Sequence, residues 1–267
     1  MGKILKSLLF LNNYFPTRVT PVDDIKSLIK RLRPIVVPNE LIRIGPDSDG
    51  GYIVPNDLQN IAKCFSPGVS NECGFEKNCA RRGIPVFMAD WSVERPPLND
   101  KRFHFTKKFI GSYNNDKFMT FNEWVTMHTQ LNEEILIQMD IEGFEYEVLL
   151  SADSKILKSC RILIVEFHNL DQLWNRIFFN MIARVFDKIL QTHDVVHIHP
   201  NNCCDYDLHK GIQIPRAMEF TFYNKRFSKK RVGHSTIPHP LDRDNVTDKP
   251  SIKLSPLWYQ SKNEFDQ

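Results

Sequence analysis

The segment LIQMDIEGFEYEVLL, residues 136–150, decides the fold. Its first four residues read as a buried strand, and the carboxylates Asp140, Glu142 and Glu145 follow closely, with Gly143 among them. In an open parallel sheet, ligands bind beyond the carboxyl ends of the strands. The segment therefore predicts a strand that ends at a ligand-binding edge of a sheet and then leads into a helix.

Outward from this segment, strand-like and helix-like stretches alternate along the chain. The expected strands begin near residues 61, 84, 102, 134, 160, 194 and 217, and the expected helices lie near residues 75–83, 120–128, 144–152 and 175–193. Thr120 and Glu123 have the spacing of a capping box at the start of one of these helices. Apolar strands that alternate with helices predict a Rossmann-like α/β fold, with a mostly parallel seven-stranded sheet and helices on both faces.

Two further elements precede the alternation. Residues 21–33 carry apolar side chains at helical spacing, and Asp49-Gly50-Gly51 forms a turn signal between two short strand-like runs, which predicts a β-hairpin. The chain is expected to divide into an N-terminal helical and hairpin extension over residues 1–57, a main domain over residues 58–232, and an irregular tail over residues 233–267 that packs on that domain.

The composition is that of a globular protein. Of 267 residues, 42% are hydrophobic, and 35 Lys and Arg against 32 Asp and Glu leave a net charge of +3. This near balance gives no case for a nucleic-acid partner. The six cysteines show no CxxC pair, which indicates reduced thiols and a cytoplasmic location.

The N-terminus begins with a basic residue and a short apolar patch, SLLFL, at residues 7–11. The patch is too short for a signal-peptide core, and no stretch approaches the length of a membrane span. A helix packed on the domain is favoured, and a short amphipathic helix in peripheral contact with a membrane is the alternative.

Polar residues gather where the expected strands end. They are Ser66, Gly68 and Ser70 after the first strand, Asp90 after the second, Asp140 and Glu142 after the fourth, and Glu166 and His168 after the fifth. Side chains two apart on an extended strand point the same way, which pairs Asp140 with Glu142 and Glu166 with His168. Capping of the next helix explains one carboxylate, but not a matching pair on the neighbouring strand.

The first two strand ends suit a nucleoside-type cofactor. Gly68 allows the backbone to approach a ligand closely, and an acid about 20 residues later, Asp90, can accept hydrogen bonds from ribose hydroxyls. Pro67 and Ser70 stand where a dinucleotide-binding turn has glycines, so a pyrophosphate fits poorly. S-adenosylmethionine is a cofactor of the kind that fits.

Several segments together resemble the FkbM-type S-adenosylmethionine-dependent methyltransferases. They are ILIQMDIEGFEYEVLLSA, RILIVEFH, FMTFNEWV, FSPGVSNECGFEKNCARRGIPVFMAD, the hairpin IGPDSDGGYIVPNDL and the tail AMEFTFYNKR, and they span roughly residues 40–245. The chain departs from the family at the cofactor turn, where Phe65-Ser66 replaces the usual acid and the turn has fewer glycines.

The resemblance implies an O-methyltransferase for a hydroxyl of a sugar or glycan-like acceptor, with Asp140 and Glu142 beside the reacting methyl group. It places the cofactor against the first two strand ends and these two acids, that is, against Ser66, Gly68, Ser70, Asp90, Asp140 and Glu142. The expected fold is the Rossmann-like fold of class I methyltransferases.

A sugar hydroxyl is a weak nucleophile that needs a base or a metal ion to take up its charge. His168 is the first candidate base, since imidazole titrates near neutral pH, and Glu166 would orient it or bind the acceptor. A structural role for His168 is the alternative. Asp140, Glu166 and His168, with Glu142, also form a ligand set suited to Mg²⁺ or Mn²⁺.

Further residues are weaker candidates to line or cover the acceptor pocket. They are Asp47, Asp49 and Tyr52 of the hairpin, His197, His199, Asn201 and Asn202 after the sixth strand, and His239 and Asp242 of the tail. Two other functions remain open: a metal-dependent nucleotide-sugar transferase with the acids as a diphosphate clamp, and a non-catalytic binding domain on a methyltransferase fold.

Overall fold

The computed structural model describes residues 16–69, 71–229 and 236–260, together with three single residues near the N-terminus. Apart from these three, the residues of the expected N-terminal helix, with its membrane-contact alternative, lie outside the described part of the chain, and so does Ser70. No helix in the described part of the chain is long and apolar enough to cross a membrane.

A seven-stranded sheet forms the centre of the structure. Across the sheet the strands are β10 (His193–Pro200), β13 (Met218–Asn224), β9 (Cys160–Phe167), β8 (Ile135–Met139), β3 (Lys63–Pro67), β4 (Val86–Ala89) and β5 (Phe103–Thr106). Only β13 runs antiparallel to its neighbours, and the pairs from β9 to β5 are all parallel. This confirms the predicted Rossmann-like fold with a mostly parallel sheet.

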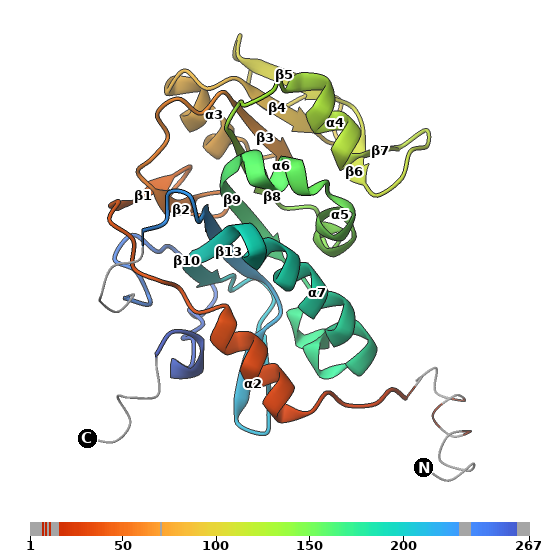
Figure 1. Cartoon of the computed structure of the whole chain (residues 1–267). Coiled ribbons are helices and arrows are strands. Elements are labelled where there is room, and N and C mark those ends of the chain that lie inside the picture. The colour runs from red at the N-terminus through yellow and green to blue at the C-terminus, as the bar shows by residue number, and fades with distance from the viewer. Residues whose placement is uncertain are drawn as a thin grey trace.

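Helices cover both faces of the sheet, as Figure 1 shows. One face carries α4 (Phe121–His128), α5 (Glu145–Ser151), α6 (Ser154–Ser159) and α7 (Arg176–Thr192), and the other carries α3 (Gly74–Arg81) with the hairpin of β1 (Leu41–Ile44) and β2 (Tyr52–Pro55). α2 (Val22–Arg31) packs with the first group.

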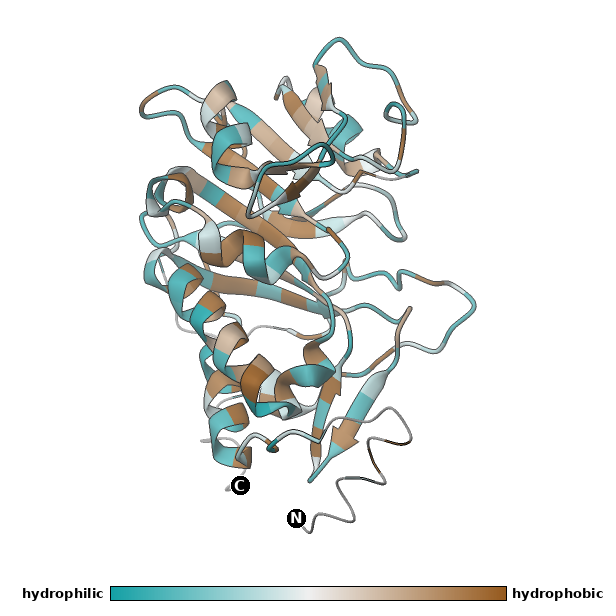
Figure 2. Cartoon of the chain, turned by 90° about the vertical axis from the view of Figure 1, so that its right-hand side faces the viewer, coloured by the Kyte–Doolittle hydropathy of each residue, from teal (hydrophilic) through white to brown (hydrophobic). Residues whose placement is uncertain are grey.

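The central strands are buried on both faces of the sheet. Successive residues along one strand face two different clusters of the core. On β3, Phe65 belongs to the cluster under α4–α7, whereas Cys64 belongs to the cluster under α3 and the hairpin. In Figure 2 the central strands are mostly brown, whereas the helices alternate between brown and teal. This pattern is why near-continuous apolar runs in the sequence predict central strands.

The expected strand over residues 102–111 is divided in two. It leaves the sheet at Lys107 and Lys108, and continues as β6 (Phe109–Gly111), which pairs in parallel with β7 (Phe118–Thr120). The physical reason is a turn in which the Lys108 amide donates to the Thr106 carbonyl, while the Lys107 ammonium reaches Glu94 at the surface.

The rest of the chain folds against this core. A hairpin of β11 (Tyr206–His209) and β12 (Ile212–Pro215) and the short 3-10 helices η1 (Leu170–Trp174) and η2 (Pro256–Trp258) were not expected. The described part of the tail lies on the protein, with Trp258 fully buried and its indole N–H donating to the Gln213 carbonyl. At the start of α4, the Thr120 hydroxyl accepts from the Glu123 amide, so half of the expected capping box forms.

Candidate functional site

A cavity of about 700 Å³ opens at the carboxyl ends of β3, β4 and β8, where the sequence predicts ligand binding. It is lined by six carboxylates and by no Lys, Arg or His among the described residues. These carboxylates belong to Asp49, Glu72, Glu76, Asp90, Asp140 and Glu142. The cavity therefore favours a ligand that carries positive charge.

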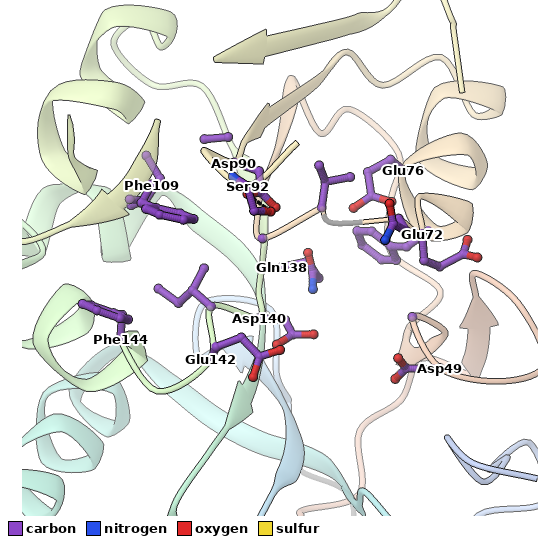
Figure 3. A pocket seen from close by; sticks show the side chains of 18 of the residues that line it. Asp49, Glu72, Glu76, Asp90, Ser92, Phe109, Gln138, Asp140, Glu142 and Phe144 are labelled. Carbon is purple, nitrogen blue, oxygen red and sulfur yellow. Dashed lines mark hydrogen bonds between the residues drawn. The ribbon is translucent and has the colours of Figure 1, made fainter. Parts of the chain in front are cut away.

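The two ends of the cavity differ in chemistry. Figure 3 shows Phe109 and Phe144 at one end, and Glu72 and Glu76 at the other, with Asp90 and Asp140 between them. Phe118 joins the aromatic end, where its ring centroid lies 5.4 Å from that of Phe109 and 5.6 Å from that of Phe144. Such a site offers flat apolar surface to a ring system and carboxylates to polar or cationic groups.

Gly68 lies where the backbone of two strand ends meets. Its φ is +89°, and a Cβ atom at this position would lie 1.7 Å from the carbonyl oxygen of Asp140. Only glycine fits both this left-handed conformation and this close approach. The cofactor turn predicted at Gly68 is therefore held directly against the strand end that carries Asp140.

Ser66 lies beneath the cavity instead of lining it. It is fully buried, and its hydroxyl bridges Glu76 Oε1 and Gln138 Oε1, while the Gln138 amide donates to the Tyr52 hydroxyl at 3.0 Å. The side chain of Ser66 therefore supports the cavity from inside the protein, and the expected contact of Ser66 with a cofactor stays a prediction. Ser70 lies outside the described residues, so its expected contact stays a prediction.

Glu76 is a cavity residue that the sequence did not reveal. Burial raises the pKa of its carboxyl group to about 7, although the hydrogen bond with Ser66 acts in the opposite direction. At the β3 end, the carboxyl group of Glu76 lines the cavity, whereas the side chain of Ser66 does not. Its place in α3 looks like an ordinary polar position of a helix, so the sequence carries no local signal for it.

Asp90 stands at the end of β4, as predicted, and lines the cavity. Its Oδ1 accepts hydrogen bonds from the amide of Ser92 at 2.7 Å and from the hydroxyl of Ser92 at 2.6 Å. These bonds fix the carboxylate in one orientation (Figure 3). A fixed carboxylate at this strand end suits recognition of paired hydroxyl groups.

Beside the cavity, His168 lies among the predicted acids. Its Nε2 is 3.8 Å from Asp140 Oδ1, 3.7 Å from Glu142 Oε2 and 3.8 Å from Glu166 Oε1. Its Nδ1 is 3.1 Å from Glu145 Oε1. Asp140 and Glu142 line the cavity, whereas Glu166 and His168 lie next to them outside its lining. The structure thus brings together four residues that the sequence placed at two strand ends.

The charges in this cluster bear on the choice of base. Burial alone would lower the pKa of His168, but the hydrogen bond to Glu145 and the nearby carboxylates Asp140 and Glu142 raise it to about 9. Burial raises the pKa of Asp140 to about 7. A histidine that is protonated at neutral pH is a poor base, so these pKa shifts favour Asp140, while the catalytic role expected of His168 stays a prediction.

The weaker candidates divide into two groups. Asp49 and Tyr52 line the cavity, whereas Asp47 is exposed and pairs with Arg43 and Arg243 at the surface.

The other group of weaker candidates holds the C-terminal tail or supports the cluster around His168. His197 and His199 lie 3.0 and 3.6 Å from Asp242, Asn202 bonds the tail carbonyls of Val246 and Lys249, and Asn201 donates to Glu166. None of this second group lines the cavity.

Comparison with known proteins finds one family model that matches part of the chain. No curated protein matches the chain. Residues 91–195 match the family model of the methyltransferase FkbM domain. This span begins directly after Asp90, ends in β10, and includes Asp140, Glu142 and His168. The resemblance predicted from the sequence is thereby confirmed over these residues, which are similar to the methyltransferase FkbM domain.

Proposed function

We propose that this protein is an S-adenosylmethionine-dependent O-methyltransferase that acts on a hydroxyl of a sugar or glycan-like acceptor. The observation that supports it best is the acid-lined cavity, which lies at the strand ends of a methyltransferase fold and against the Gly68 turn. Its volume, about 700 Å³, is within the range of small-molecule sites.

The residues of the cavity fit the cofactor. The six carboxylates suit its cationic sulfonium and amino groups, Asp90 suits its ribose, and Phe109, Phe118 and Phe144 offer apolar surface to a purine. When bound, the cofactor supplies an electrophilic methyl group on a positively charged sulfur. Gly68 would keep the ends of β3 and β8 in contact beside it.

Asp140 would act on the acceptor. Because burial raises its pKa to about 7, its carboxylate can take up the hydroxyl proton while the acceptor oxygen bonds to the methyl carbon. The electrons of the broken carbon–sulfur bond stay on sulfur, so the transfer requires no oxidant or reductant. The exposed carboxylates Glu72 and Glu142 are placed to accept hydrogen bonds from other hydroxyls of a sugar.

A nucleotide-sugar transferase is less well supported. Its donor brings a diphosphate, and the cavity lining offers six carboxylates and no cationic side chain among the described residues. A non-catalytic binding domain is also less well supported, because the cavity retains the Asp90 carboxylate and a carboxyl group of near-neutral pKa. The cytoplasmic location, the sugar or glycan acceptor and the lack of a nucleic-acid partner stay predictions.

Calorimetry with S-adenosylmethionine tests the cofactor first, and methyl transfer to a panel of sugars and glycans then tests the reaction. We expect one-to-one binding that Asp90→Ala weakens about 10-fold, in line with the loss of hydrogen bonds to a charged group. Glu94→Ala is the matched control, because Glu94 is exposed four residues away. If the wild-type protein bound UDP-sugars and not S-adenosylmethionine, the transferase would replace this proposal.

A further inference from the structure

A buried carboxylate, that of Glu145, joins the two strand ends that carry the cluster around His168. The side chain is fully buried, and its Oε1 accepts hydrogen bonds from the amides of Ile141 and Gly143 at 3.0 and 3.1 Å. The same oxygen lies 3.1 Å from Nδ1 of His168. One oxygen atom at the start of α5 therefore contacts both the turn after β8 and the imidazole after β9.

The turn after β8 has a backbone conformation that needs support from its surroundings. Glu142 has a φ of +56°, which is uncommon for a residue other than glycine, and Gly143 follows with a φ of +103°. Such strained positions persist where the surrounding structure holds them in place. The two amides bonded to Glu145 flank Glu142 in the chain, so they hold the turn in which Asp140 and Glu142 line the cavity.

The end of β9 is held by the same helix. The hydroxyl of Tyr146, the next residue of α5, donates to the backbone carbonyl of His168 at 2.5 Å, while Glu145 contacts the imidazole. Asn169 has a φ of +57°, and a Cβ atom at Gly143 would lie 3.1 Å from Nδ2 of Asn169, so the two turns lie against each other. The first turn of α5 thus fixes the ends of β8 and β9 relative to each other.

A simpler role for Glu145 would be that of a helix cap. In a capping box, a glutamate or a glutamine accepts from an amide at the start of the helix, and either residue serves. A cap therefore does not require the negative charge, and burying a charge is costly unless it is paired. In the described part of the chain, Oε2 of Glu145 accepts no hydrogen bond, and His168 is the partner of the carboxylate. The charge of Glu145 therefore indicates a role beyond capping.

Provided that the proposed function holds, we propose that Glu145 is a positioning residue for methyl transfer, which acts through His168 and through the turn of residues 140–144. The imidazole that it holds lies 3.8 Å from Oδ1 of Asp140, the proposed base. In the described part of the chain, the charged groups that face this imidazole are the carboxylates of Asp140, Glu142, Glu145 and Glu166. Glu145 thereby sets both the position and the electrostatic surroundings of the base.

Glu145→Gln separates this role from capping. A glutamine can still accept from the two amides, but it removes the charge beside His168. With an acceptor from the panel of sugars and glycans, we expect kcat to fall at least about 10-fold, because a misplaced catalytic group slows the reaction. KM and the Kd of S-adenosylmethionine should change less than about 2-fold. Glu147→Gln is the matched control, because Glu147 lies on the same helix and does not line the cavity.

Nuclear magnetic resonance with labelled histidine tests the contact without cofactor or acceptor. The signal of His168 is assigned by its loss in His168→Ala, and the buffer contains a chelator, so that no bound ion contributes. In Glu145→Gln the imidazole should titrate at least about one pH unit lower than in the wild type, because a neighbouring carboxylate raises the pKa of a histidine. Glu145→Asp, whose shorter side chain should lose the contact, is a second variant with the same expected losses.

Circular dichroism shows whether each variant is folded. The proposal is overturned if folded Glu145→Gln retains the wild-type kcat, or if His168 titrates in that variant as it does in the wild type. A wild-type protein that binds no S-adenosylmethionine would instead overturn the proposed function. The titration would then still decide separately whether Glu145 holds the imidazole.

Discussion

Asp140 combines a position in the cavity with a carboxyl pKa near neutrality. We expect Asp140→Asn to lower the rate of methyl transfer at least 100-fold, since general-base catalysis contributes about 10²–10⁴-fold and an amide cannot take up the proton. The rate is measured with labelled cofactor, and circular dichroism checks the fold. Asp116→Asn, in an exposed loop, is the control. Near-normal turnover of Asp140→Asn would remove this residue from the mechanism.

Gly68 and Gly83 allow a matched comparison of two left-handed glycines. Their φ angles are +89° and +85°, but a Cβ at Gly83 meets no atom within 4 Å, whereas one at Gly68 meets the Asp140 carbonyl oxygen at 1.7 Å. Gly83→Ala should cost about 1–2 kcal/mol in the free energy of unfolding, from backbone conformation alone. Gly68→Ala should cost more, and it should also weaken cofactor binding because the Asp140 backbone must move.

Urea unfolding of both glycine variants and calorimetry with the cofactor measure these effects. The comparison separates strain that any left-handed position imposes from the close contact found only at the cofactor turn. Equal losses of stability in the two variants, with unchanged cofactor binding, would show that the contact between Gly68 and Asp140 is unimportant.

Between secondary-structure elements, Asp242 joins the C-terminal tail to β10. Burial alone would raise the pKa of Asp242, but the nearby imidazoles of His197 and His199 hold it well below its usual range. Burial alone would lower the pKa of His199, but Asp242 and the charge of Glu219 raise it despite the opposing charge of Arg43. The tail is therefore tied to the strand by groups that titrate.

The direction of the pH effect follows from these shifts. The lowered pKa of Asp242 stabilises the folded state above about pH 4, and this contribution is lost as the pH falls further. The raised pKa of His199 stabilises it below about pH 6.5, and this contribution is lost as the pH rises through the folded-state value. The tail should be held most firmly between these limits.

Hydrogen exchange at residues 236–260 measures this attachment. After correction for intrinsic exchange rates, we expect lower protection at pH 8.5 than at pH 6 in the wild-type protein. Asp242→Asn should reduce protection at pH 6 and abolish most of the difference, whereas Asp248→Asn, at an exposed position of the tail, should not. A wild-type tail with the same protection at both pH values would contradict this assignment.

The elements most readily predicted were those with a repeating apolar pattern. The seven strands, the helices α3, α4, α5 and α7 and the Asp49-Gly50-Gly51 hairpin follow from periodicity and turn residues, whereas the short helix α6 was not expected. The β11–β12 hairpin was missed because its turn, Lys210-Gly211, is not one of the common hairpin dipeptides. The break between β5 and β6 was missed because apolar residues resume directly after Lys107 and Lys108, so the whole run was interpreted as one strand.

The candidate site was predictable as a set of strand ends, but not as a set of charges. The positions of Asp90, Asp140, Glu166 and His168 follow from where strands stop. The protonation of His168 depends on Glu145, whose fully buried side chain reaches back from α5. Such contacts arise only in the packed structure, so local sequence patterns could not indicate which group is the base.

Across the protein, the fold depends on close packing between the sheet and the helices that cover it. The ring of Phe186, on α7, is fully buried and lies 4.8 Å from that of Phe167 on β9 and 5.7 Å from that of Phe220 on β13. Phe186→Ala should lower the free energy of unfolding by about 3–5 kcal/mol, because it removes buried apolar surface and leaves a cavity.

Ile177→Ala is the control on the same helix. Its side chain is 72% exposed, so its loss should change stability by no more than about 0.5 kcal/mol. Urea unfolding followed by circular dichroism measures both variants. The helix α7 packs on β9, and β9 carries Glu166 near its end. A large loss of unfolding free energy in Phe186→Ala would therefore show that α7 stabilises the sheet that positions the site. A loss as small as that of Ile177→Ala would mean that α7 contributes little to holding the sheet.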